Sequence, residues 1–453
     1  MSASMLTVFL KQLGYKIIPL FHSDKKHGLS QEIMDILLTK EPSLLWIPDA
    51  GTNDTEQCEQ LSKLGWQILI SDHHQLFQDN PYAIIVNNQM SPNVINKQGC
   101  GATVTWHCLH NINQQLANSF ISYVMIATLG DSMSLVSQEN RCFIKWGKLN
   151  IHPNLQPFVD ELNKDNTNRG YSFGLVTNLN SLIRLGTLKE KEELFKALCG
   201  EVEPNNIIDI CKKYHTKQQN ESAKLADNID IDDSKNIIIG EIENTPMTGL
   251  VANKIMSKYN KPTILVHKED SQYIGSMRSP IEFKDIINES KCATSVGHNS
   301  ASGVFINDMD KFKDYIYSVK LCEPCTDVLR SYTTTSIPSE LFSLKSIGNE
   351  LWGMGIQEPI VNIHSIHINS SDIRELGNGL TIKFTYQGVD FIHFFTSNKL
   401  KEELYMDKPT KIMLNVIGTL DWNEFRGKKT KQIIMDKIEC VEDNKALSFE
   451  DLF

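Results

Sequence analysis

The sequence predicts an α/β protein that ends in a small antiparallel β-barrel, and three observations support this fold class. First, apolar stretches at 44–51 and 66–70 flank a helix-like segment at 55–64, which is the pattern of a strand–helix–strand unit with parallel strands. Second, strands and helices alternate again from residue 236 onward. Third, short strand-like segments separated by Gly and Asn follow residue 336, and they predict a barrel.

Composition is that of a globular protein. The chain has 453 residues, of which 41% are hydrophobic and 22% are charged. No apolar run approaches the roughly 20 residues of a membrane span, and we expect no signal peptide. The ten cysteines show no disulfide framework, which suits a reducing cytosol. A net charge of −10 argues against non-specific coating of nucleic acid but allows a local basic groove.

Residues 1–150 are expected to form the first α/β domain. An amphipathic helix at 1–13 is followed by a predicted strand at 15–20. Asp54 is a plausible N-cap for the helix that joins the two parallel strands described above. A further strand is predicted at 82–87, so the domain should contain a central parallel sheet.

Carboxylates and imidazoles gather where these elements end. Asp49 ends one strand, Asp72, His73 and His74 follow the next, and a helix at 120–129 delivers Asp131. In open α/β sheets the ligand crevice lies beyond the carboxyl ends of the strands, so these side chains can converge there. Such groups bind metal ions or carry protons. The alternative for Asp72-His73-His74 alone is a polar loop with surface histidines.

Three motifs decide between these interpretations: PDAGTND around Asp49, SDHHQ around His73, and ATLGDSMSLVSQENR at 127–141. Together they resemble the DHH phosphoesterase superfamily and, within it, the RecJ-type single-strand DNA exonucleases, over nearly the whole chain. The resemblance implies a site for two divalent ions, Mn²⁺ or Mg²⁺. Asp49 would bridge the ions, His73 and Asp131 would be ligands, and His74, with Asp72, would be catalytic and face the scissile phosphate.

One motif of that family is not visible in this sequence. RecJ-type proteins carry a strand and an Asp-x-Asp-x-Asp-Gly turn directly before the helix that stands here at 1–13. We therefore expect one ion site that is largely intact and a second that is incomplete. Three explanations remain open: the start of this sequence is assigned too late, a separate chain supplies the strand, or catalysis has been lost.

Residues 151–235 should form a helical connector, and 236–335 a smaller α/β domain. The segment YSFGLVTNLNSLIRLGTL resembles the connecting helix segment of RecJ-type proteins, and this resemblance makes Arg184 a candidate phosphate contact. A salt bridge on a helix face is a common alternative. The segments YIGSMRS and SVGHNSASG resemble elements of the DHH-associated C-terminal domain. The resemblance implies a phosphate-binding group formed by Ser276, Arg278, Gly297 and His298. Val296 replaces a glycine of the family pattern, and a β-branched residue tolerates positive φ poorly.

Residues 336–442 are expected to form an OB-type barrel of five strands. The segment GTLDWNEFRG resembles the signature of the RecJ OB domain. Single-strand binding combines backbone electrostatics with base stacking. The expected DNA-binding residues are Trp422, Arg426, Lys428 and Lys429, and barrel core is the alternative for any single aromatic.

The tail, 443–453, carries four large apolar residues, Leu447, Phe449, Leu452 and Phe453. It resembles the C-terminal tails with which T4-like phage replication proteins bind their sliding clamp. Docking on the protein's own surface is the alternative.

The resemblance implies a RecJ-like, metal-dependent 5′-to-3′ exonuclease acting on single-stranded DNA in the cytoplasm of a bacterial or phage-infected cell. Two other classes remain. One is a catalytically impaired DNA-binding or replisome accessory protein. The other is a phosphodiesterase for short oligonucleotides or small molecules, against which the barrel argues.

Overall fold

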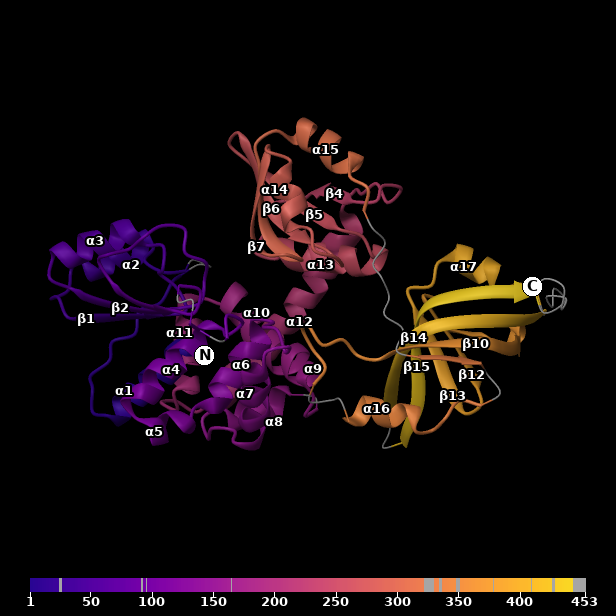
Figure 1. Ribbon diagram of the computed structural model, residues 1–453, viewed down its shortest axis with the longest axis horizontal. Helices are drawn as coiled ribbons and strands as arrows, with labels where there is room; N and C mark the ends of the chain where they lie inside the picture. Colours follow the sequence, from indigo (N-terminus) through magenta and orange to yellow (C-terminus); the bar gives the residue numbers. More distant parts are fainter. Residues whose placement is uncertain are drawn as a thin grey trace. The chain divides into compact units, whose positions relative to one another are not determined.

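The computed structural model divides into two compact units, and each is described by itself (Figure 1). Unit 1 contains Met1–Cys322 and the short segment Gly353–Ile356, and unit 2 contains Glu323–Trp352 and Gln357–Phe453. The structure describes residues 1–23, 27–90, 93, 94, 96–163, 165–321, 330–333, 336–347, 351–377, 379–408, 410–425 and 428–442. Arg426 and the apolar tail residues predicted above lie outside the described residues.

A three-stranded parallel sheet organises the start of unit 1. Its strands, in sheet order, are β1 (Leu44–Pro48), β2 (Gln67–Asp72) and β3 (Ile84–Asn87). Helices α2 (Gln31–Leu37) and α3 (Thr55–Lys63) bury their apolar side chains against one face. On the other face Trp46 packs into the core that includes α1 (Ser2–Gln12) and α4 (Gly101–Ile112). The sheet is thus sandwiched between helices, as parallel strands require.

The predicted strand at 15–20 is wrong. This segment contains no strand, and Tyr15 and Ile18 are largely exposed. Its apolar, β-branched composition favours extended backbone, but a strand needs a neighbour whose amides and carbonyls it can pair with. Among the described residues the sheet consists of β1, β2 and β3 alone, so this segment pairs with none of them.

The remainder of the first part of unit 1 is helical. Its further elements are α5 (Gln114–Asn118), α6 (Ile121–Gly130), α7 (Gln138–Leu149), α8 (Gln156–Leu162), α9 (Asn168–Gly170), the π-helical turn η1 (Tyr171–Val176), α10 (Thr177–Leu185), α11 (Leu188–Leu198) and α12 (Asn205–Asn228). Helix α6 is apolar on nearly all sides and is buried among its neighbours. It lies at the centre of these helices (Figure 1) and carries Asp131 directly after its last residue.

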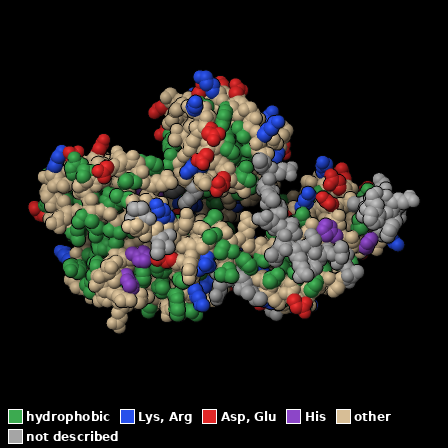
Figure 2. Space-filling view, in the orientation of Figure 1, with side chains coloured by type: hydrophobic (Ala, Val, Ile, Leu, Met, Phe, Trp, Pro, Cys, Tyr) green, Lys and Arg blue, Asp and Glu red, His purple; other side chains and the backbone are tan. Residues whose placement is uncertain are grey.

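A five-stranded mixed sheet follows in unit 1. Its strands, in the order β4-β5-β6-β8-β7, are β4 (Ile238–Glu241), β5 (Thr263–Glu269), β6 (Gln272–Arg278), β8 (Ala301–Ile306) and β7 (Ala293–His298). Helices α13 (Thr248–Tyr259), α14 (Lys284–Glu289) and α15 (Met309–Ser318) pack on it. In Figure 2 acidic and basic side chains are interspersed over this part, so the visible face is not uniformly basic.

Unit 2 is built on a seven-stranded sheet, in the order β11-β12-β13-β15-β14-β10-β9. The five predicted strands are present as β10 (Ile360–Asn369), β12 (Thr381–Tyr386), β13 (Val389–Phe394), β14 (Lys411–Phe425) and β15 (Lys428–Glu442). Two short strands, β9 (Arg330–Thr333) and β11 (Arg374–Leu376), extend the sheet. Unit 2 also contains the helices α16 (Leu341–Ile347), η2 (Ser370–Asp372) and α17 (Asn398–Glu403). None of the described helices in either unit is long and apolar enough to cross a membrane.

Candidate functional site

Asp49 and Asp72 meet at one edge of the parallel sheet. Pro48 pairs with Ser71, and the Asp49 amide donates to the Ser71 carbonyl at 2.8 Å, so both strands end side by side. Asp49 has a left-handed backbone with φ of 69°, an unfavourable conformation that tends to occur at functional sites. Gly101, at the start of α4, leaves room for this side chain, because a Cβ there would overlap Asp49 Oδ1.

Asp72 is almost fully buried, and the protein satisfies both of its carboxylate oxygens. Oδ2 accepts from Thr52 Oγ1 at 2.6 Å, and Oδ1 lies 2.7 Å from His74 Nδ1 and 2.7 Å from the His73 amide. Burial alone would raise the pKa of Asp72, but the hydrogen bonds from His74 and Thr52 outweigh it and hold this pKa well below its usual range. Asp72 is therefore a fixed negative charge that orients its neighbours.

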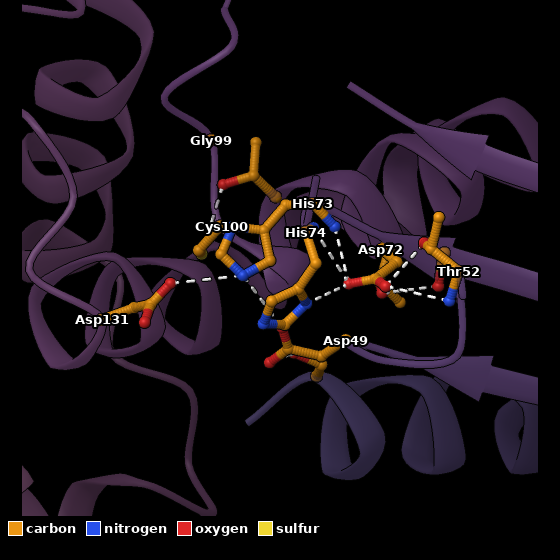
Figure 3. A network of polar contacts seen from close by, with 12 residues as sticks. Asp49, Thr52, Asp72, His73, His74, Gly99, Cys100 and Asp131 are labelled. Atoms are coloured by element: carbon orange, nitrogen blue, oxygen red, sulfur yellow. Dashed lines mark hydrogen bonds and ion pairs between the residues drawn. The ribbon is translucent and has the colours of Figure 1, made fainter. Parts of the chain in front are cut away.

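His73 lies between two carboxylates from different elements (Figure 3). Its Nε2 is 3.4 Å from Asp49 Oδ1 and 3.4 Å from Asp131 Oδ2, and its side chain is 10% exposed. Each carboxylate is about two-fifths exposed. The structure thus brings together Asp49 from the end of β1, His73 from the end of β2 and Asp131 from the end of α6.

His74 is the exposed member of the group. Its ring is 4.6 Å from that of His73, centroid to centroid, and its side chain is 59% exposed. The hydrogen bond to Asp72 raises the pKa of His74, and the charges of Asp49 and Asp131 act in the same direction. Because Nδ1 faces Asp72, Nε2 remains the ring nitrogen for an external group.

Two residues support this arrangement that the sequence interpretation missed. Asn87, at the end of β3, donates from Nδ2 to Thr52 Oγ1 at 3.0 Å and to the His74 carbonyl at 2.9 Å. Thr52 in turn donates to Asp72, so a buried chain of hydrogen bonds fixes the loop that carries His74. The signal that could have revealed Asn87 was its position at the end of a strand, where it pairs with Asp72 across the sheet.

The donor atoms suit a divalent cation. Ligand atoms of Asp49, Asp72, His73 and His74 lie within 4.8 Å of one another. We regard Asp72 as an orienting group, because hydrogen bonds within the protein already engage its two carboxylate oxygens. We count Asp131 as a ligand in its place, because the Asp131 carboxylate lies beside His73 Nε2. Two carboxylate oxygens and one imidazole nitrogen form a donor set that fits Mn²⁺ or Mg²⁺.

A second cluster in unit 1 has the opposite charge. Arg278 ends β6, and its guanidinium lies beside Gly249 in the first turn of α13, where Ser276 also points. Burial, and then the charge of Arg184, lower the pKa of Arg278, while burial lowers that of Arg184. Among the described residues neither guanidinium forms an ion pair with a carboxylate. Two half-buried cations close to each other are an unbalanced pair that an anion would stabilise.

The segment SVGHNSASG forms the hairpin of β7 and β8. Val296 lies in regular strand backbone, and the positive φ of 130° belongs to Gly297. Valine at position 296 therefore does not cause the backbone strain expected from the sequence. His298 is the last residue of β7, and its side chain lies outside the described part of the structure.

In unit 2, Trp422 lies in β14 and pairs with Lys431 of β15. Lys429 Nζ lies 4.8 Å above the Trp422 ring, and Phe342 meets that ring edge-on at 5.7 Å. Lys428 and Lys429 are exposed at the start of β15. The structure thus combines a cation and an aromatic ring at the end of a long hairpin.

Comparisons with known proteins find similarity to RecJ-type proteins. Residues 342–437 match the RecJ OB domain. The chain is 25% identical to a putative SPbeta prophage-derived single-strand DNA-specific exonuclease, YorK, of Bacillus subtilis, over 97% of this chain and 85% of that protein. It is 22% identical to the single-stranded-DNA-specific exonuclease RecJ of Haemophilus influenzae, over 98% and 86%. The crystal structure of Thermus thermophilus RecJ in complex with Mn²⁺ shares the fold, with a TM-score of 0.71 and 18% identity, over 97% of this chain and 66% of that one.

Proposed function

Because the chain is a RecJ-like protein of the DHH superfamily, we propose that it is a metal-dependent exonuclease that hydrolyses phosphodiester bonds of single-stranded DNA in the 5′-to-3′ direction. One observation carries this proposal: His73 lies 3.4 Å from both Asp49 and Asp131, at the carboxyl ends of parallel strands. A carboxylate–imidazole–carboxylate arrangement in that position supports a cation site there.

In this proposal Asp49, His73 and Asp131 hold the ion. A bound divalent ion would lower the pKa of the attacking water and would offset charge on the phosphoryl oxygens. Asp72 fixes the ring of His74, and His74 Nε2 donates to an oxygen of the scissile phosphate. Asn87 and Thr52 keep the His74 loop in place while DNA binds.

Ion stoichiometry follows from the described ligands. Asp49, His73 and Asp131 are enough for one Mn²⁺ with water in the remaining positions. A second ion would have to share Asp49, so we expect the chain to bind one Mn²⁺ far more tightly than two.

The arginine cluster is proposed to hold DNA phosphates. Arg184 and Arg278 supply the charge, and Ser276 beside the start of α13 supplies a hydroxyl donor. The backbone at Gly297 and the side chain of His298 are assigned to the same phosphate group on the basis of the sequence resemblance. In unit 2, Trp422, Arg426, Lys428 and Lys429 are proposed to contact the strand further from its end.

The apolar tail residues Leu447, Phe449, Leu452 and Phe453 are proposed to bind a sliding clamp at replicating DNA. This proposal rests on the sequence alone. Deleting 448–453 should abolish clamp association and leave DNA binding and the melting temperature unchanged. A lowered melting temperature without any change in clamp association would establish self-docking instead.

The nuclease proposal is tested with purified chain, Mn²⁺ and single-stranded DNA labelled at either end. We expect mononucleotide release that begins at the 5′ end. His74→Ala should remove it, while the exposed-aspartate control Asp35→Asn on α2 should not. Wild-type cleavage by His74→Ala would refute the site assignment. Binding without any cleavage by the wild type would favour the accessory class.

A further inference from the structure

A π-helical turn interrupts a helix in the helical region between the two sheets of unit 1. Helix α9, the turn η1 and helix α10 run without a break from Asn168 to Leu185. The Thr177 hydroxyl donates to the Phe173 carbonyl at 2.8 Å, and Asn178 Nδ2 donates to the Gly174 carbonyl at 2.8 Å. Side chains therefore satisfy the carbonyls of the widened turn. π-helical turns are rare and are frequently found at functional sites.

The turn presents Phe173 to solvent. Its side chain is 63% exposed, and the guanidinium carbon of Arg169 lies 5.8 Å from the ring centroid. Among the described aromatic pairs none includes Phe173. Single exposed apolar residues are normal on protein surfaces, so the exposure of Phe173 alone does not indicate a binding site. The pairing with an arginine is more specific, because a guanidinium over a ring can contact both a base and a phosphate.

Phe173 lies on the helix that carries Arg184 of the arginine cluster and that packs beside Asp131 of the acidic cluster. Thr177, Asn180 and Arg184 follow one another at spacings of three and four residues, so they share one side of α10. The Thr177 hydroxyl, which begins this side, contacts the Phe173 carbonyl in the preceding turn. Between them Val176 packs against Gly130, which directly precedes Asp131. The helix rise places Phe173 and Arg184 roughly 15 Å apart along the helix axis. A strand held at Arg184 can therefore run along the helix toward Phe173.

We propose that Phe173 and Arg169 form a stacking platform for one nucleobase of single-stranded DNA, several nucleotides from the phosphate held by Arg184 and Arg278. The inference rests on the proposed function, because it assumes that the arginine cluster holds DNA. Every base has an aromatic face, so such a platform grips the strand without selecting its sequence. It also fixes the distance from the gripped base to the metal centre.

The test measures binding of full-length protein, in EDTA, to a fluorescent 5′-phosphorylated oligothymidine. A single abasic site is moved stepwise from the 5′ end. The wild type should lose affinity at one particular position of the abasic site. Phe173→Ala should bind the intact strand roughly tenfold more weakly and no longer respond to that position. Phe173→Leu keeps the apolar volume without the ring and should behave like Phe173→Ala, whereas Phe173→Tyr should behave like the wild type.

Ile183→Ala is the matched control. Ile183 is also an exposed apolar residue on the same helix but has no aromatic ring, and its variant should bind like the wild type. Equal affinities of the wild type and Phe173→Leu, or identical abasic profiles, would overturn the platform while leaving the nuclease proposal intact. A wild-type chain that does not bind the strand at all would overturn both.

Discussion

The acidic centre and the arginine cluster of unit 1 are built in contrasting ways. Asp49, His73 and Asp131 come from the ends of three elements, and a buried network through Asp72 and Thr52 fixes the loop between them. The arginine cluster consists of two long side chains in partial burial, without a carboxylate partner in the described chain. The first cluster is rigid and short of positive charge, and the second is adaptable and short of negative charge.

This difference matches the two tasks of a phosphodiesterase. Chemistry needs donor atoms fixed to fractions of an ångström, and only short side chains on strand and helix ends provide that. Holding a strand that must advance needs charge without fixed geometry, which guanidinium groups on long stems provide. A metal-bound phosphodiester carries the charges that both clusters lack.

The largest expected effect is at the acidic centre. Asp131→Asn removes a charged ligand, and loss of the ion's charge stabilisation should slow cleavage by roughly 10³-fold or more. Calorimetry should show one tight Mn²⁺ in the wild type and none in the variant. Binding of single-stranded DNA in EDTA should stay within about twofold, because the arginine cluster is untouched.

Two tight ions of equal affinity in the wild type would contradict this prediction and would reveal ligands beyond Asp49, His73 and Asp131. A parallel loss of DNA binding in Asp131→Asn would mean that the two clusters are not separate in function.

The second-largest effect is expected at Asp72, which orients the ring of His74. Asp72→Asn keeps the shape of the side chain but removes the charge that holds His74, so cleavage should fall roughly 10- to 100-fold. Mn²⁺ affinity should change much less than in Asp131→Asn, since Asp72 is not counted as a ligand. Measuring rate and Mn²⁺ affinity in the same preparation separates the two roles. An Mn²⁺ affinity as poor as that of Asp131→Asn would make Asp72 a direct ligand.

The sequence predicted that Asp49, His73 and Asp131 would lie close together, and the structure places them so, because each follows directly after a strand or a helix. It could not predict Thr52 and Asn87, whose role depends on pairing across the sheet. Asp54 was placed correctly at the start of α3, but its carboxylate accepts from the distant Leu29 amide at 2.7 Å instead of capping the helix. The hydrogen-bond partners of these side chains are set by the tertiary structure, and local sequence propensity carries no information about them.

The predicted strands were likewise limited by the lack of tertiary information in the local sequence. The five strands predicted in unit 2 are present, but the short strands β9 and β11 were not predicted, and 15–20 was wrongly predicted because nothing local reveals a missing neighbour. The π-helical turn has no sequence signature that separates it from an ordinary helix, so Phe173 was not a candidate.

A smaller effect is expected at the arginine cluster. Arg278→Ala should weaken binding of single-stranded DNA roughly 5- to 10-fold and reduce the slope of log Kd against log salt by about one phosphate contact. Mn²⁺ affinity should equal that of the wild type, which is the converse of Asp131→Asn. Fluorescence anisotropy over a series of salt concentrations provides both values. An unchanged slope would show that Arg278 has a structural role beside α13.

The smallest effect is expected in unit 2, where Lys429 lies over Trp422. Lys429→Ala removes one exposed charge and leaves the ring, so affinity for long single-stranded DNA should fall only about twofold to threefold. Lys437→Ala is the matched control, because Lys437 is exposed on the same strand but is paired with Glu439. If unit 2 contacts the strand away from its end, the effect of Lys429→Ala should vanish on very short oligonucleotides, whereas that of Arg278→Ala should persist. A Lys429→Ala effect that is equal at all lengths would place this contact at the end of the strand, together with the arginine cluster.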